Sequence, residues 1–146
     1  MSYYFYTNHP YFRQSDQSLI TDIETATQEE FQAITCYEKL ARMAPKEVRN
    51  QILEIREDER KHLQVFQSIY SHLTGRQPSQ PTQVICANSY REGLIAAFKD
   101  EQNSVDFYLE IADRAQDRAI REAFQRAALD EQNHAVWFSF FLMSQR

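Results

Sequence analysis

The sequence predicts an all-α protein folded as a four-helix bundle. Only two glycines and four prolines occur among 146 residues, and residues that favour helices, such as Glu, Gln, Ala, Leu and Arg, are abundant. Four long segments repeat apolar residues at alternating intervals of three and four, which is the spacing of one buried helix face. A chain of this length forms one domain around a single core, and we expect almost no strand.

Two helices are expected first, over residues 18–43 and 45–73. Pro45 suits the first turn of a helix and leaves only a short connection. The two helices are therefore predicted to be antiparallel neighbours. The apolar stripe of the second helix runs from Val48 to Leu73, which we expect to face inward.

A polar linker over residues 74–88 separates these helices from the next two. Gly75 is a suitable stop for the second helix. At ~3.3 Å per residue the linker could stretch roughly 45 Å, enough to cross the bundle from end to end, so the second and third helices can lie parallel. Ser89, with Glu92 three residues later, predicts the start of the third helix, and Asp117 is a good N-cap for the fourth.

Residues 1–16 are predicted to form an aromatic-rich arm ahead of the bundle domain, residues 17–146. Six aromatic side chains fall within the first twelve residues. Such rings would pack on the bundle or on a second subunit. A role of the arm in assembly or cross-linking is the alternative.

A repeated motif interrupts the apolar stripes of the second and fourth helices. Residues 58–62 read DERKH, and residues 130–134 read DEQNH. Positions i and i+3 share one face of a helix, so each motif presents a carboxylate and an imidazole to one point. The paired residues are Glu59 with His62, and Glu131 with His134.

The first and third helices supply two more acids, Glu30 and Glu101. Each is followed seven residues later by a tyrosine, Tyr37 or Tyr108. All four motif glutamates lie fourteen to sixteen residues from the nearer interhelical turn, or about 20 Å along a helix. The sequence therefore predicts that six side chains meet at one level of the bundle.

Four carboxylates at one level of an apolar core require a cation. An unpaired buried carboxylate costs several kcal/mol or takes up a proton, and none of the four stripes contains Lys or Arg. Two divalent ions per chain would balance four glutamates, and ligands with O and N but no thiolate suit iron or manganese, with zinc as a further candidate. The alternatives are surface residues that merely resemble ligands and a degenerate site that has lost its metal.

With these motifs the chain resembles the ferritin-like di-iron carboxylate superfamily, most of all a rubrerythrin-type four-helix bundle, over about residues 17–143. The shared pattern is one Glu from each of two helices and E-x-x-H from each of the other two. The resemblance implies an antiparallel ferritin-like bundle with one long crossover. It also implies roles for particular residues: Glu30 and Glu101 as terminal ligands, Glu59 and Glu131 as bridges, His62 and His134 each on one ion, and Tyr37 and Tyr108 as hydrogen-bond donors to ligand carboxylates. Core aromatics with hydroxyls satisfied elsewhere are the alternative for the tyrosines.

Two departures limit what the resemblance implies about activity. Ser104 stands where rubrerythrins usually have a further glutamate, and the chain lacks the CxxC motifs of a rubredoxin domain. Storage in a ferritin cage is disfavoured because no fifth helix follows the fourth. The resemblance implies oxidoreductase chemistry of peroxidase or ferroxidase type, with a di-iron centre that reacts with O2 or peroxide and a separate electron donor. A non-catalytic metal-binding or assembly protein, associated with the spore coat, is the alternative, so whether the chain is an enzyme stays open.

Net charge and cysteine content limit which binding partners and which cellular compartment we expect. The net charge of −5 and the pI near 5.4 argue against a nucleic-acid-binding protein, which usually has a basic surface. The sequence shows neither a membrane-spanning run nor a secretory signal at its start. Cys36 and Cys86 form no CxxC pair and are too few for a disulfide scaffold. We expect a cytoplasmic homodimer without nucleic-acid or membrane partners, in which Cys86 has no structural role.

Overall fold

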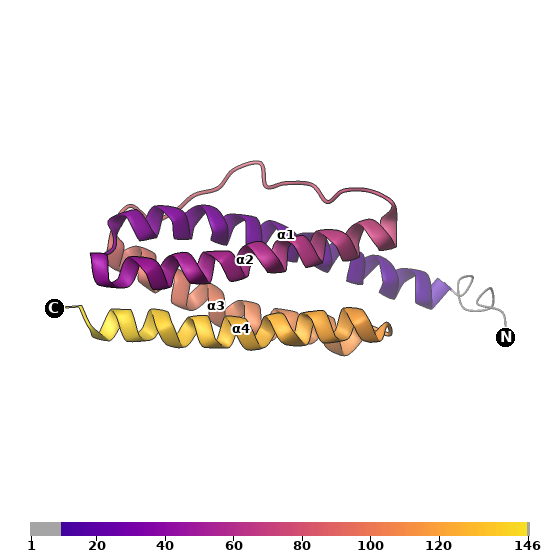
Figure 1. Ribbon diagram of the computed structural model, residues 1–146. Helices are drawn as coiled ribbons and strands as arrows, with labels where there is room; N and C mark the ends of the chain where they lie inside the picture. The colour runs from indigo at the N-terminus through magenta and orange to yellow at the C-terminus, as the bar shows by residue number, and fades with distance from the viewer. Residues whose placement is uncertain (1–9, 146) are drawn as a thin grey trace.

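The structure is a computed structural model that describes residues 10–145, and it contains four helices (Figure 1). They are α1 (Pro10–Met43), α2 (Lys46–Thr74), α3 (Tyr90–Arg114) and α4 (Arg118–Met143). No strand occurs within residues 10–145. The prediction of an all-α bundle is confirmed. In the same part of the chain, no helix has both the length and the apolar composition that crossing a membrane requires.

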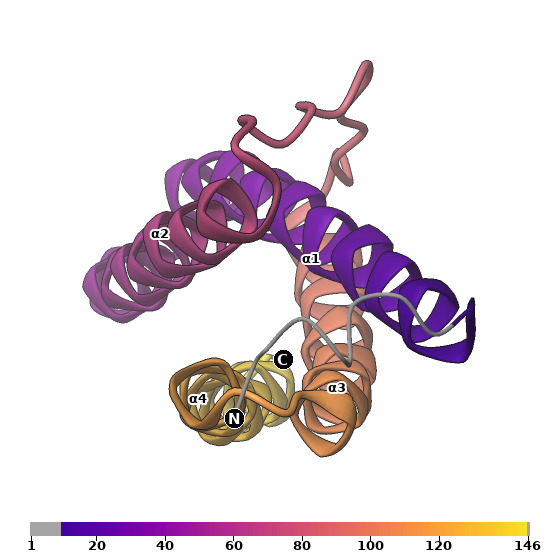
Figure 2. The ribbon, with the colours of Figure 1, turned by 90° about the vertical axis from the view of Figure 1, so that its right-hand side faces the viewer.

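The helices form two antiparallel hairpins that pack against each other. Helix α1 packs along α2, and α3 packs along α4. Viewed along the bundle, α1 and α2 lie on one side and α3 and α4 on the other (Figure 2). The connection from α2 to α3 runs the length of the bundle, so α2 and α3 point the same way (Figure 1). The predicted long crossover is therefore confirmed.

Local sequence signals set most helix ends. Gly75 ends α2 in the left-handed conformation with φ 71°, which glycine adopts at little cost because it has no Cβ. Ser89 caps α3 by accepting a hydrogen bond from the backbone N–H of Glu92. Asp117 caps α4 by accepting from the backbone N–H groups two and three positions later. All three were predicted as helix boundaries.

Two helix ends differ from the prediction. Helix α1 begins at Pro10, so residues 10–16 of the predicted arm are helical, whereas residues 1–9 of the arm lie outside the described part of the chain. Proline suits a first helical position because the N–H that it lacks would have no partner there. At the end of α2, Leu73 is 40% exposed and Tyr70 is buried instead. A straight helix drifts away from a strict three-and-four repeat, which shifts the buried face near its end.

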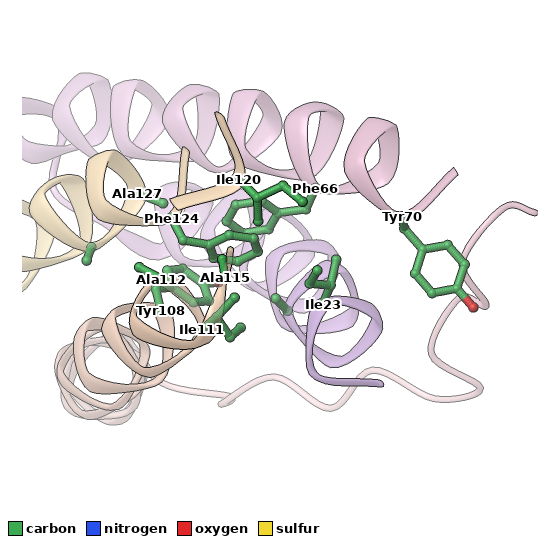
Figure 3. Close-up of a cluster of buried hydrophobic side chains, with 12 residues drawn as sticks. Ile23, Phe66, Tyr70, Tyr108, Ile111, Ala112, Ala115, Ile120, Phe124 and Ala127 are labelled. Carbon is green, nitrogen blue, oxygen red and sulfur yellow. The ribbon is translucent and has the colours of Figure 1, made fainter. Parts of the chain in front are cut away.

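Two apolar clusters make up the core. The first contains Ile23, Phe66, Tyr108 and Phe124, and the second contains Leu40, Ile52, Leu94 and Phe138. In the first cluster, the rings of Phe66 and Phe124 stack with centroids 4.2 Å apart, and Tyr108 meets Phe66 edge-on (Figure 3). The motif glutamates of each helix fall between the two clusters in the sequence. The polar level of the bundle is therefore closed by apolar packing on both sides.

A disulfide joins Cys36 on α1 to Cys86 in the linker. The Sγ atoms are 2.10 Å apart and the Cα atoms 5.3 Å apart. The prediction that Cys86 has no structural role is wrong. Fifty residues separate the two cysteines, so no local spacing reveals the pair, and only the path of the linker along α1 brings them together.

Opening the disulfide should lower the free energy of unfolding by up to about 4 kcal/mol, because the bond closes a loop of roughly fifty residues in the unfolded chain. Urea denaturation followed by circular dichroism, with and without dithiothreitol, measures this difference. The Cys36→Ser/Cys86→Ser double variant should be as stable as the reduced protein and insensitive to the reductant. Equal denaturation midpoints for the oxidised and reduced protein would contradict the expectation.

Candidate metal centre

The fold brings all six predicted ligand residues to one place. They form two overlapping groups, in each of which one ligand atom per residue lies within 4.8 Å of the others. The groups are Glu30, Glu59, His62 and Glu131, and Glu59, Glu101, Glu131 and His134. Every member is at most 7% exposed. Glu59 and Glu131 belong to both groups, which is the arrangement expected of residues between two ions.

Each histidine is oriented by the aspartate of the opposite motif. His62 Nε2 lies 2.9 Å from Asp130 Oδ2, and His134 Nε2 lies 2.9 Å from Asp58 Oδ2. A carboxylate accepts a hydrogen bond, so the proton sits on Nε2 of each ring. Nδ1 of each ring faces the glutamates, and once this nitrogen has given up its proton its lone pair can bind a metal ion.

Asp58 and Asp130 contact the candidate ligands, and the sequence interpretation did not identify them. Their signal was present, since an aspartate precedes the glutamate in both copies of the motif. Positions i and i+4 share a helix face, so spacing alone would pair each aspartate with the histidine of its own motif. Only the packing of α2 against α4 shows that each aspartate serves the histidine of the other motif.

Replacing Asp58 or Asp130 by alanine should weaken metal binding by about 10–100-fold without changing the number of ions bound at saturation. Without its aspartate, each imidazole can rotate or carry its proton on Nδ1, and both changes reduce its value as a ligand. Competition titration against a fluorescent chelator measures the affinity. Asp106→Ala, at an exposed position of α3, is the matched control. Unchanged affinity in both motif variants would show that the aspartates do not orient the ligands.

The two tyrosines hold glutamates of the opposite half of the bundle. Tyr37 on α1 donates its hydroxyl proton to Glu101 Oε1 at 2.5 Å, and Tyr108 on α3 donates to Glu30 Oε1 at 2.6 Å. Burial, followed by the nearby carboxylate, raises the pKa of each tyrosine well above its ordinary value. Both phenols therefore stay protonated and act as donors.

Several polar atoms of the centre have no partner with hydrogen-bond geometry, although His134 Nδ1 lies 2.8 Å from Glu59 Oε1. They are Glu30 Oε2, Glu59 Oε1, Glu101 Oε2, Glu131 Oε1 and His134 Nδ1. Leaving one buried polar atom unpaired costs about 1–3 kcal/mol, and more if it is charged. Among residues 17–145, no Lys or Arg is buried, so no side chain of fixed positive charge in this range compensates these atoms. The donor set of oxygen and nitrogen atoms fits divalent metal ions, and iron or manganese in particular.

Without metal, the centre must hold extra protons. Burial and neighbouring carboxylates raise the pKa of Glu59 and of Glu101 well above the ordinary glutamate value. Burial lowers the pKa of His62 and His134, but hydrogen bonds to carboxylates outweigh it and raise both pKa values. For Glu131, burial raises the pKa, but the two histidines close to its carboxylate outweigh it and lower the pKa to about 2. Metal ions would therefore displace protons when they bind.

A cavity of about 350 Å³ lies beside the centre, lined mainly by residues of α1, α3 and the linker. Glu30, Glu101 and Glu131 form part of its wall, as does Ser104. Cys86 lines the same cavity from the linker side. A small molecule in this cavity would stand next to three of the six candidate ligands.

Comparison with known proteins agrees with this architecture. A model of the ferritin-like domain matches residues 7–144. The uncharacterized protein YhjR of Bacillus subtilis (strain 168) is 44% identical over 144 residues, which cover 98% of this chain and 99% of that protein.

Solved structures show the same fold at low identity. A conserved hypothetical protein of Mycobacterium tuberculosis superimposes with a TM-score of 0.80 at 13% identity, over 90% of this chain and 95% of that one. The bacterioferritin of Desulfovibrio desulfuricans, described with a diiron site in different catalytic states, gives a TM-score of 0.76 at 19% identity, over 89% of this chain and 81% of that one. The match to the domain model, which extends over nearly the whole chain, shows that this protein belongs to the ferritin-like domain family.

Proposed function

We propose that this protein binds two metal ions, iron in the first place, and that its centre reacts with peroxide or O2. The observation that carries the proposal is the convergence of four buried glutamates and two buried histidines whose ligand atoms lie within 4.8 Å of one another in each group. Glu30 and His62 would hold one ion, and Glu101 and His134 the other. The two residues common to both groups, Glu59 and Glu131, would lie between the ions.

The surroundings of the centre support redox chemistry over a purely structural role. Iron held there would supply reversible one-electron chemistry at each ion, and the diiron site of the related bacterioferritin is consistent with this choice. The chain's own residues keep the ligands in place: Asp58 and Asp130 fix the imidazoles, and Tyr37 and Tyr108 fix the outer glutamates. The cavity leaves room beside the centre for a small oxidant.

Anaerobic titration tests this function. Metal-free protein with its disulfide closed is loaded with ferrous iron and mixed with hydrogen peroxide. We expect two ferrous ions to be oxidised for each peroxide, because each ion gives one electron and peroxide takes two to form two waters. Near-ultraviolet absorbance and a ferrous chelator assay follow the iron. Bound iron that is oxidised no faster than iron in buffer would favour the alternative, a metal site that only stabilises the fold.

The homodimer and the compartment remain part of the proposal. Four large apolar side chains of α4 are more than half exposed: Leu129, Val136, Phe140 and Met143. Their spacing of seven, four and three residues places them on one face of the helix. Such a stripe suits contact with a second copy or with an assembly, and sedimentation velocity measures the former directly. We keep the cytoplasm, or a spore, as the proposed location.

A further inference from the structure

The Cys36–Cys86 pair and the candidate metal centre share one cavity. Both cysteines line it together with Glu30, Glu101 and Glu131. Along α1, Cys36 lies six residues from Glu30, which is a rise of about 9 Å. Cys36 also directly precedes Tyr37, whose hydroxyl is bonded to Glu101. The sulfur pair and the centre therefore open onto the same cavity.

The disulfide is placed where a reductant can reach it. Both cysteines are only partly buried, and Ile85 beside Cys86 is 73% exposed. In a reducing compartment, the disulfides that do occur are usually transient and take part in redox reactions. Accessibility to an external thiol is the first requirement for such a role.

The linker stays attached to α1 on both sides of the disulfide. Glu24 accepts hydrogen bonds from the backbone N–H and the hydroxyl of Ser79, each at 2.8 Å. Lys39 Nζ donates to Asn88 Oδ1 at 2.8 Å. These contacts do not depend on the S–S bond, so they would hold the two thiols near each other after reduction. The pair is thus built to close again.

We propose that Cys36 and Cys86 are a two-electron dithiol–disulfide donor to the metal centre, an inference that rests on the function proposed above. Two S–H bonds break and one S–S bond forms, which releases two electrons and two protons. These reduce one hydrogen peroxide, whose O–O bond breaks, to two waters. An external dithiol then reopens the disulfide by thiol–disulfide exchange.

The proposal is tested by counting free thiols and ferrous iron after one equivalent of peroxide has reacted. The protein is reduced, freed of reductant, loaded with two ferrous ions per chain and given one equivalent of hydrogen peroxide without air. Alkylation followed by mass spectrometry counts the free thiols, and a chelator assay counts ferrous iron. We expect both thiols to be lost while both ions are recovered as ferrous. In the metal-free protein, the thiols should be lost at least about tenfold more slowly, since direct attack depends on thiolate character and exposure.

Matched proteins separate this inference from the proposed function. In the Cys36→Ser/Cys86→Ser variant, and in wild-type protein whose thiols are blocked by alkylation, the same peroxide should leave both ions ferric. If iron is oxidised in these proteins while the wild-type thiols stay free, the donor role is wrong and the proposed function survives. If iron is not oxidised in any of them, the proposed function itself fails.

The redox equilibrium of the two cysteines in metal-free protein gives a second test. The metal-free protein is equilibrated in buffers of reduced and oxidised dithiothreitol, and its thiols are counted by the same alkylation. A donor pair must open in the folded protein as the buffer becomes more reducing and close as it becomes more oxidising. A disulfide that stays closed under every condition that preserves the helical circular dichroism signal would be a structural crosslink, and the proposal would be overturned.

Discussion

Glu59→Ala and Glu131→Ala should each abolish the binding of two metal ions per chain. These are the two residues that both candidate ligand groups share, so either substitution reduces both groups from four members to three. Elemental analysis of protein loaded with ferrous, manganous or zinc ions gives the stoichiometry, and calorimetric titration gives the affinity. The effect should exceed that of the aspartate variants, because a lost bridge affects both ions.

A control for the Glu59 variant lies on the same helix, α2. Glu54 is exposed on α2, and Glu54→Ala should bind metal as the wild type does. His72 is also exposed, and its replacement by alanine should leave metal binding unchanged. Glu29 is a poorer control because it lines the cavity beside Glu30. Glu59→Gln keeps the shape of the side chain and should lose the bridge without leaving a void. Two ions bound with unchanged affinity in the Glu59 and Glu131 variants would show that the dinuclear assignment is wrong.

Metal ions should raise the free energy of unfolding by about 3 kcal/mol at a hundredfold excess over Kd, because they bind the folded bundle far better than the unfolded chain. For a helical domain of this size, that corresponds to a rise in melting temperature of several degrees. Scanning calorimetry of metal-free protein, with and without each ion, measures the shift. A melting temperature that is unchanged by ferrous, manganous and zinc ions at pH 7 would point to a degenerate site.

The same stabilisation should depend on pH with a definite sign. In the metal-free protein, Glu59, Glu101 and both motif histidines have raised pKa values. The folded state therefore binds more protons than the unfolded chain above pH 4.5 through the glutamates, and above pH 6.5 through the histidines as well. The free energy of unfolding therefore falls as the pH rises, by about 1.4 kcal/mol per pH unit for each extra proton. Glu131, with its pKa lowered to about 2, has the opposite effect, and its contribution is lost as the pH falls below 4.5.

These two effects predict that the metal-free bundle is most stable at mildly acidic pH. Metal binding has the reverse dependence, since protons compete with the ions for the same carboxylates and imidazoles. The gain in melting temperature on adding metal should thus be small near pH 5 and increase towards pH 7.5. A gain that is equal at both pH values would mean that the ions bind elsewhere, away from the groups with shifted pKa values.

The sequence by itself determined the helices, most of their ends and the residues that meet at the centre. A helix repeats every 3.6 residues, so the face on which Glu30 or Glu59 lies follows from its neighbours in the chain. Caps such as Ser89 and Asp117 act within three residues, and the pattern of a single sequence is enough to find them. Equal distances from the turns then placed the six side chains at one level.

Only the tertiary structure decided which of these groups touch. Periodicity gives the face of a helix but not the rotation of its neighbour, so it could not pair His62 with Asp130 or Tyr37 with Glu101. The disulfide was missed for the same reason, because the stretch between Cys36 and Cys86, which are 50 positions apart, carries no local signal of where the linker lies. Contacts of this kind depend on how whole helices and the linker pack, and that packing is set by the sum of many apolar contacts that no short stretch of sequence contains.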